Sequence, residues 1–245
     1  MMQTTVFSSE QEIARTAGEI FCGFARRKPK AVFGFATGST PLGVYSYMAS
    51  EYRAGRVSFA QVKTFNLDEY CGLTKDDENS FFAFMQENLF SQTDIQAKNI
   101  HFLDGTAANY NAECRRYDAE IAAAGGLDIQ LLGIGPNGHI GFNEPGKYFT
   151  EGSFKVKLSQ STIDANSVYF EGRDMPQYAL TMGIGSIFRA RKIILLALGE
   201  QKAQAVNEML RGKITPRWPA SILKLHDNVS IFLDEAAASL VRDIV

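Results

Sequence analysis

The stretch from Leu127 to Gly146 places the strongest constraint on the fold. An apolar run, Leu127–Leu132, has the length and composition of a strand buried in a parallel sheet. Glycines then end the strand and allow the backbone to come close to a ligand. The loop that follows contains one imidazole, His139, and one carboxylate, Glu144. Because ligands of open α/β sheets bind beyond the carboxyl ends of the strands, we predict that the chemistry takes place at this loop.

The same loop also matches a dinucleotide-binding pattern. Gly133, Gly135 and Gly138 satisfy G-x-G-x-x-G, which should open a helix and be followed by an acid roughly 20 positions later. Here Pro136 lies within the loop, more helix-breaking residues follow, and no acid stands in the right place around Leu158. We therefore expect neither a nicotinamide nor a flavin cofactor.

Apolar runs and helical patterns alternate along the rest of the chain. Strands are expected at residues 4–7, 31–36, 62–67, 179–183, 192–198 and 229–233. This order predicts an α/β fold with a doubly wound, largely parallel, Rossmann-like sheet and helices on both faces. We expect one domain, residues 1–245, with a mobile lid segment at residues 159–176.

Helix boundaries are indicated by capping residues and by glycine. A capping box beginning at Ser9 should start the first helix, and Thr40 should be the N-cap of the next, with Pro41 at its first position. Further helices are expected at residues 79–90 and at 106–123, where Gly125-Gly126 closes the second of them. Two more should run from residue 199 to 210 and from residue 219 onward.

Two strand-to-helix junctions have the composition of a phosphate site. Thr37, Gly38, Ser39 and Thr40 follow one strand and offer backbone N–H groups, hydroxyls and a helix N-terminus. Lys202 lies in the first turn of a later helix, where a positive charge opposes the helix dipole unless an anion lies nearby. An ordinary capped helix and a solvent-facing lysine account for the same residues on local grounds.

An acidic pair, Asp68-Glu69, directly follows the strand at residues 62–67. Adjacent side chains of extended backbone point to opposite faces, so one carboxylate should face a ligand and the other a structural partner or solvent. On local grounds alone, a solvated acid is the simpler interpretation of either residue.

Composition excludes several classes of function. The 245-residue chain has a net charge of -2 and a pI of about 6.0, so neither nucleic acid nor a membrane is an expected partner. We find no secretory signal, and the three cysteines, Cys22, Cys71 and Cys114, lie far apart without a C-x-x-C pair. We expect a cytoplasmic protein without a structural metal.

Four ordered segments together resemble the glucosamine-6-phosphate deaminase family, and they span most of the chain. They are residues 36–41 (ATGSTP), 64–70 (TFNLDEY), 133–144 (GIGPNGHIGFNE) and 198–203 (LGEQKA). The resemblance implies an enzyme that converts glucosamine 6-phosphate to fructose 6-phosphate and ammonia, as in amino-sugar catabolism, with neither metal nor organic cofactor. It leaves open whether the protein is a monomer or a homo-oligomer.

The resemblance also implies a role for each matched residue. Asp68 corresponds to the base that moves a proton between C2 and C1, and His139 to the group that opens the sugar ring. Glu144 corresponds to the carboxylate that orients His139. Thr37, Gly38, Ser39, Thr40 and Lys202 correspond to the phosphate site. These assignments are chemically consistent, because an aldose–ketose conversion needs a carboxylate near C2 and an acid–base group at the ring oxygen.

Three positions depart from the family pattern. Asn137 stands where many members have a second catalytic acid, so it can hydrogen-bond but adds no charge. Val168 stands where many members have a phosphate-binding arginine, so that either Arg173, close by in sequence, substitutes for it or fewer cations hold the phosphate. Phe154 and Val156 stand where regulated members have basic residues, so we expect little allosteric activation.

Three other functions fit parts of the pattern. A galactosamine-6-phosphate deaminase would differ only in the C4 epimer that it accepts. A 6-phosphogluconolactonase shares the glycine-histidine loop but typically lacks the Phe-Asn-Glu-Pro segment that contains Glu144. A non-catalytic sugar-phosphate sensor should carry a DNA-binding segment, which the sequence does not show.

Overall fold

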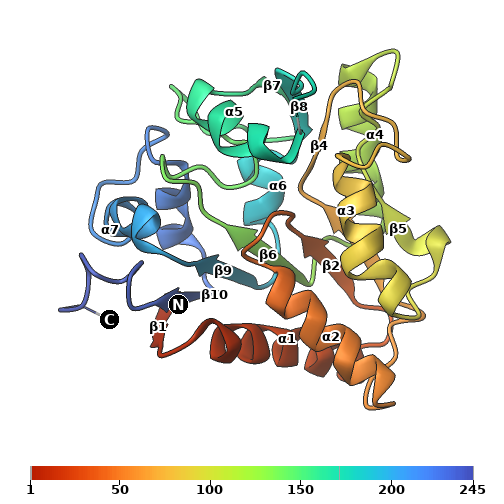
Figure 1. Ribbon diagram of the computed structural model, residues 1–245, viewed down its shortest axis with the longest axis horizontal. Helices are drawn as coiled ribbons and strands as arrows, with labels where there is room; N and C mark the ends of the chain where they lie inside the picture. The colour runs from red at the N-terminus through yellow and green to blue at the C-terminus, as the bar shows by residue number, and fades with distance from the viewer. Residues whose placement is uncertain (1, 171, 245) are drawn as a thin grey trace.

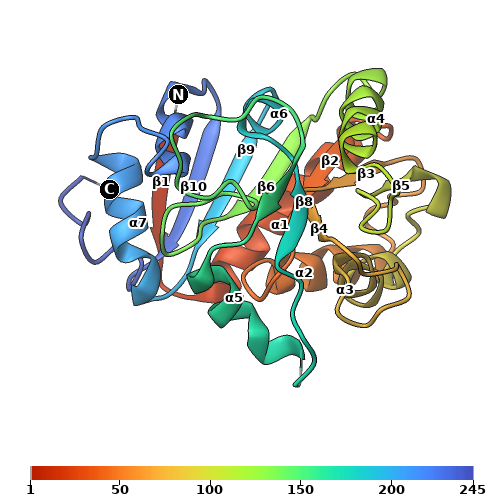
Figure 2. The ribbon, with the colours of Figure 1, turned by 90° about the horizontal axis from the view of Figure 1, so that it is seen from above.

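The computed structural model describes residues 2–170 and 172–244, and its centre is a parallel sheet (Figure 1). The described strands of this sheet follow the order β1-β10-β9-β6-β2-β3-β5, and every neighbouring pair is parallel. Figure 2 shows these strands side by side. Their bounds are β1 Met2–Phe7, β2 Val32–Phe35, β3 Lys63–Asn66, β5 Ile100–His101, β6 Ile129–Gly133, β9 Ile193–Ala197 and β10 Val229–Asp234. The predicted doubly wound parallel sheet is confirmed.

Helices pack on both faces of the sheet. One apolar cluster joins helices α1, α2 and α3 to side chains such as Phe33 and Leu131. The other joins α4, α6 and α7 to the opposite face, through residues such as Phe65 and Leu195. The helices are α1 Glu10–Arg27, α2 Leu42–Arg53, α3 Phe81–Asn88, α4 Tyr110–Ala123, α5 Gln160–Asn166, α6 Ile184–Phe188 and α7 Ala203–Leu210. Short 3₁₀ segments are η1 Phe90–Gln92, η2 Ala97–Asn99, η3 Ser167–Phe170, η4 Glu200–Lys202 and η5 Pro219–Leu225.

A second, smaller sheet was not predicted from the sequence. Its order is β4-β8-β7, with β4 Asp68–Tyr70, β7 Phe154–Lys157 and β8 Tyr178–Thr181, and its pairs are antiparallel. The chain bends at Leu67, whose N–H still donates to Phe35 of the parallel sheet while its carbonyl accepts from Met182. Figure 1 shows β7, β8 and α5 together, at the end of the molecule opposite α1 and α2.

Most predicted helix boundaries are confirmed, and four are wrong. One is the start of α7, which begins at Ala203 after the 3₁₀ segment η4 and not at residue 199. Ser9 caps α1, and Gly125 and Gly126 end α4 with positive φ angles. Thr40 is not the N-cap of α2: the helix starts at Leu42 after a turn, and no side chain caps it. Helix α4 starts four residues later than expected, because Asn109 supplies the cap. The segment at residue 219 is a 3₁₀ helix.

The segment expected to be a lid, residues 159–176, is folded. It contains α5 and η3, with Phe170 buried against Tyr70, and residue 171 lies outside the described residues. Motion of the segment stays a prediction.

The strand order identifies where a ligand should bind. From β2 the chain continues to β3 on one side, whereas from β6 it continues to β9 on the other side. Open α/β sheets bind ligands at such a switch point, at the carboxyl ends of the strands.

In the described residues we find no helix long and apolar enough to cross a membrane.

Candidate active site

The loop after β6 folds back on itself and presents His139. The Gly135 N–H donates to the His139 carbonyl at 2.9 Å, and the Gly138 N–H donates to the Gly135 carbonyl at 2.9 Å. Gly138 has a φ of 82°, which favours glycine, and any β-carbon there would collide with Trp218. The glycines therefore set the turn that holds the imidazole, and the absence of a side chain at Gly135 leaves room for the ring.

His139 and Glu144 face each other, an arrangement consistent with what the family resemblance implies. Nδ1 of His139 lies 3.4 Å from Oε2 of Glu144, and the two side chains are 18% and 12% exposed. The Asn137 amide donates to the same oxygen at 2.7 Å, while its Oδ1 accepts from the His139 N–H at 3.2 Å. Asn137 therefore joins the carboxylate to the turn without adding a charge.

Glu144 has further partners that the sequence did not reveal. Its Oε1 accepts from Oγ1 of Thr162 at 2.5 Å and from Oγ of Ser159 at 3.1 Å. Burial alone would raise the pKa of Glu144, but the hydrogen bond and the charge of His139, together with hydrogen bonds from Thr162 and Asn137, outweigh it and lower the pKa to about 2. The carboxylate is therefore ionised at neutral pH. Ser159 and Thr162 follow Glu144 by 15 and 18 residues, and no local sequence pattern connects them with the loop.

The two acids of the Asp68-Glu69 pair are both buried, so the interpretation of a solvated acid is wrong. Oxygens of Glu69 accept from the N–H groups of Tyr70, Phe81 and Phe82, at 2.9, 2.9 and 3.0 Å. Glu69 thus satisfies free donors at the start of α3 and has a structural role. Burial raises its pKa to about 7, although these donors lower it.

Asp68 faces the loop instead. A β-carbon on Gly141 would lie 3.6 Å from its Oδ2, and no hydrogen bond within the described residues reaches the Asp68 carboxylate. Burial, and next the charge of Glu69, raise the pKa of Asp68 to about 8. An unpaired carboxylate with a raised pKa is suited to take and return protons near neutral pH.

The predicted phosphate residues lie beyond the carboxyl ends of strands that flank β6. Thr37, Gly38, Ser39 and Thr40 follow β2, and Gly38 has a φ of 95°. Lys202 follows β9, the neighbour of β6 on its other side. Burial lowers the pKa of Lys202, and in residues 2–170 and 172–244 no carboxylate pairs with its ammonium group. A half-buried lysine without a counter-ion is suited to an anionic ligand.

The substitute proposed for the missing arginine is engaged elsewhere. The guanidinium of Arg173 lies 3.5 Å from Asp77 and 3.0 Å from Glu78. Val168 is 71% exposed. In the described chain we find no cluster of three or more histidine, cysteine or acidic side chains that could hold a metal.

Comparison with known proteins gives consistent matches along the chain. The family described as glucosamine-6-phosphate isomerases/6-phosphogluconolactonase matches residues 8–232. A glucosamine-6-phosphate deaminase from Thermoanaerobacter sp. (strain X514) is 44% identical over 243 residues, which is 99% of this chain and 96% of that protein. One from Lysinibacillus sphaericus (strain C3-41) is 47% identical over 221 residues, covering 90% of this chain and 93% of the relative.

Solved structures agree with these matches. A structure described as a monomeric glucosamine-6-phosphate deaminase superimposes with a TM-score of 0.94 at 41% identity, over 98% of this chain and 100% of that one. A 6-phosphogluconolactonase from Trypanosoma brucei gives 0.78 at 21% identity, over 98% and 99% of the two chains, and so shares the fold.

Proposed function

The chain belongs to the glucosamine-6-phosphate isomerase/6-phosphogluconolactonase family, and we propose that it is a glucosamine-6-phosphate deaminase, which forms fructose 6-phosphate and ammonia. The observation that carries the choice within the family is the near-complete match to relatives of that name, 44% identical over 99% of the chain. The segment that contains Glu144, typically lacking in the lactonases, supports the same choice.

The first step of the proposed reaction opens the sugar ring. His139 takes the proton of the anomeric hydroxyl and returns a proton to the ring oxygen, which leaves an open-chain aldehyde. Ionised Glu144 lies next to Nδ1 and supports the tautomer in which the other ring nitrogen exchanges protons with the substrate. Asn137 holds Glu144 in this position by its 2.7 Å hydrogen bond.

The second step moves a proton between two carbons. Asp68 removes the proton from C2, the electrons of that C–H bond form a C1–C2 double bond, and the C1 carbonyl oxygen takes up the proton that the C2 ammonium group gives up. The same carboxyl group of Asp68 then protonates C1. The C2–N bond is thereby converted to an imine, and water hydrolyses the imine to a ketone and releases ammonia. The raised pKa of Asp68, about 8, supports both halves of this transfer, since the acid form is also accessible near neutral pH.

The phosphate group would be held at a distance from the reacting carbons. We assign it to Thr37, Gly38, Ser39, Thr40 and Lys202, since both segments lie beyond carboxyl ends of strands next to β6. The desolvated ammonium of Lys202 supports this assignment, because an anion would restore part of its lost solvation.

A side-by-side assay tests the proposal. Ammonia release should be measured with glucosamine 6-phosphate and galactosamine 6-phosphate, and lactone hydrolysis with 6-phosphogluconolactone. We expect ammonia from glucosamine 6-phosphate as the fastest reaction. Faster turnover of the galactosamine compound would move the assignment to that epimer, and lactone hydrolysis without ammonia would reject the deaminase.

We also propose that the protein works in the cytoplasm as a monomer. Its cysteines, Cys22, Cys71 and Cys114, are free thiols, and the similar solved structure is described as monomeric. Sedimentation equilibrium would test the monomer, and a dimer or larger species would reject it.

A further inference from the structure

The carboxylate of Glu144 connects two parts of the molecule through its two oxygens. Oε2 faces the loop after β6, with Nδ1 of His139 at 3.4 Å and the Asn137 amide at 2.7 Å. Oε1 faces the start of α5, with Oγ1 of Thr162 at 2.5 Å and Oγ of Ser159 at 3.1 Å. Each oxygen thus has its own set of donors, and rotation of the carboxylate would break the hydrogen bonds on both sides.

The hydroxyl of Thr162 does not cap its own helix, although its Oγ1 lies 2.9 Å from Oγ of the cap residue Ser159. Helix α5 is capped by Ser159, whose Oγ accepts from the backbone N–H of Thr162 at 3.3 Å. The Thr162 hydroxyl instead donates to Glu144, and the side chain is only 4% exposed. Water therefore has little access to replace this donor, and its removal would leave a buried carboxylate oxygen with one donor fewer.

Small changes in the orientation of Glu144 should affect His139. The separation between Nδ1 and Oε2 is 3.4 Å, at the long end of hydrogen-bonding distances. A carboxylate fixed at Oε1 cannot turn Oε2 away from the imidazole, whereas one held only by Asn137 and Ser159 has more rotational freedom. The hydrogen bond from Thr162 to Glu144 therefore influences the position of the carboxylate relative to His139, although Thr162 lies far from His139 in sequence.

We propose that Thr162 is a positioning residue of the active site: its hydroxyl fixes Oε1 of Glu144, so that Oε2 stays directed at His139. The inference rests on the proposed function, since it assigns His139 to ring opening. The same hydrogen bond connects Glu144 to α5, the first element of the segment expected to be a lid. Movement of α5 away from the loop would therefore remove the donors of Oε1, which are Ser159 and Thr162.

The test compares two substitutions of one side chain. Thr162→Val keeps the shape and removes the hydroxyl, whereas Thr162→Ser keeps the hydroxyl and removes a methyl group. We expect kcat for ammonia release to fall about tenfold in Thr162→Val, which corresponds to one lost hydrogen bond to a charged group, with KM changed less than about twofold. Thr162→Ser should keep most of the activity. Gln160→Ala, at an exposed position of the same helix, is the matched control and should behave as wild type.

A second readout does not depend on the substrate. The carboxyl carbon of Glu144 can be followed by NMR during an acid titration, and its midpoint should be higher in Thr162→Val than in wild type, because a donor to the ionised form is lost. Thr162→Ser should restore the midpoint. If Thr162→Val does not fold, as judged by circular dichroism, Thr162→Ala takes its place in both measurements.

The outcomes separate this inference from the proposed function. Equal defects in Thr162→Val and Thr162→Ser, or an unchanged Glu144 midpoint in Thr162→Val, would overturn the positioning role. A wild-type protein that releases no ammonia would reject the proposed function, while the NMR titration would still decide whether Thr162 holds Glu144.

Discussion

The imidazole of His139 lies against the α-carbon of Gly135, where a β-carbon would come within 2.4 Å of Nε2 and 2.5 Å of Cδ2 and Cε1. These separations are far below van der Waals contact, so only glycine leaves the ring in its observed place. The nearby Gly133 is different, since a β-carbon there would meet no atom within 4 Å. Substitutions of Gly135 and Gly133 therefore test the position of the imidazole without changing His139 itself.

Gly135→Ala should therefore impair ammonia release much more than Gly133→Ala. The added methyl group must displace the imidazole, and a misplaced acid–base group typically costs on the order of a hundredfold in rate. Steady-state kinetics on both variants, with thermal unfolding to verify folding, measure the difference. Similar activities in the two variants would contradict the assignment of His139.

Asp68 and His139 should have separable roles. Asp68→Asn preserves shape but leaves no base for C2, so ammonia release and solvent-deuterium exchange at C2 should both fall, by roughly two to four powers of ten. His139→Gln should instead slow ring opening and retain residual turnover from substrate that is already open-chain. Glu144→Gln should resemble a milder His139 defect, because the imidazole is loosened but present.

The same three variants can reject this division of labour. Deuterium exchange and ammonia release should be measured on all of them. Near-normal exchange in Asp68→Asn together with abolished exchange in His139→Gln would mean that the roles are reversed.

The pH dependence should follow Asp68. As a base it must be ionised, and its pKa is about 8, so kcat/KM should rise as the pH is raised through that value. The pH profile of the wild-type enzyme measures this directly. A kcat/KM that is flat from about pH 6 to 9 would show that another group limits the reaction.

Asp68 should also make the protein less stable in alkali. The folded-state pKa of about 8 lies above the usual 3.8, so folding favours the protonated acid. Its stabilising contribution is complete below the unfolded value and is lost as the pH rises through about 8. Asp68→Asn should thus melt higher than wild type by at least about 2–4 °C at about pH 9, with the gain vanishing in acid. Calorimetry of both proteins at the two pH values checks this, and an equal gain at both would refute it.

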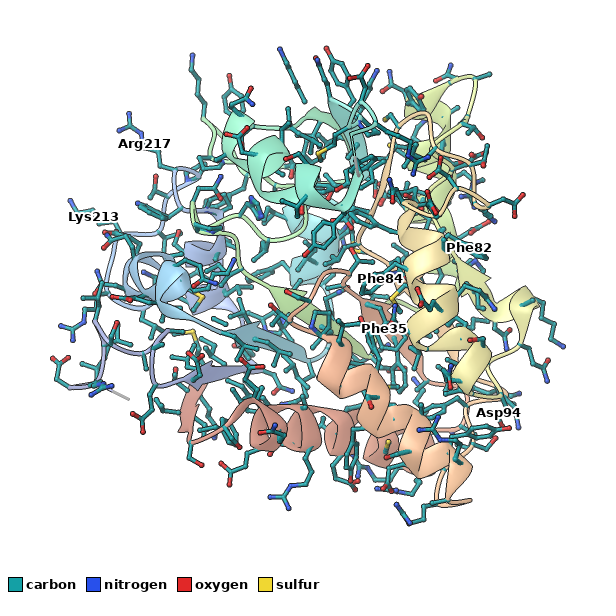
Figure 3. All side chains as sticks on the ribbon, in the orientation of Figure 1. Phe35, Phe82, Phe84, Asp94, Lys213 and Arg217 are labelled. Carbon is teal, nitrogen blue, oxygen red and sulfur yellow. The ribbon has the colours of Figure 1, made fainter. Side chains whose placement is uncertain are left out.

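Lys202→Ala should raise KM sharply and kcat less, since the ammonium group is assigned to the phosphate and not to the reacting carbons. The increase should be roughly ten- to hundredfold, the usual effect of a lost charge-assisted contact. Non-phosphorylated glucosamine should be a poor substrate. Lys213→Ala is the control, because Lys213 extends away from the body of the molecule in Figure 3. Equal turnover of glucosamine and its 6-phosphate would reject the site.

Substrate saturation should be hyperbolic, without activation by N-acetylglucosamine 6-phosphate. Phe154 and Val156, at the positions where regulated members have basic residues, line an apolar cavity of about 280 Å³ together with Phe149 and Ile184. The charged side chains of this lining are Glu144 and Lys147, a poor match for a phosphate dianion. Initial rates with and without the acetylated sugar phosphate decide the matter, and a sigmoidal curve made hyperbolic by it would contradict the prediction.

Local signals in the sequence were sufficient for the parallel sheet and for the centre of the candidate site. Apolar runs located β2, β6, β9 and β10, because strands buried on both faces need apolar side chains throughout. The short spacing of Asn137, His139 and Glu144 brought those three side chains together, because the glycines between them fold the loop on itself. The cap at Ser9 was predicted because a capping box is a local pattern, whereas the single-residue cap at Asn109 was missed.

Other features were decided by contacts between distant segments. Strand β4 pairs with β8, more than a hundred residues later, and no local sequence pattern predicts this pairing. The same packing buries Asp68 and Glu69 and raises their pKa values, whereas local sequence evidence favoured a solvated acid at either position and did not indicate which of the two faces a ligand. Thr162 reaches Glu144 only because α5 packs beside the loop. Periodicity and capping act over a few residues, whereas burial, pKa and hydrogen-bond partners depend on what the complete fold brings into contact, so the tertiary structure alone determined them.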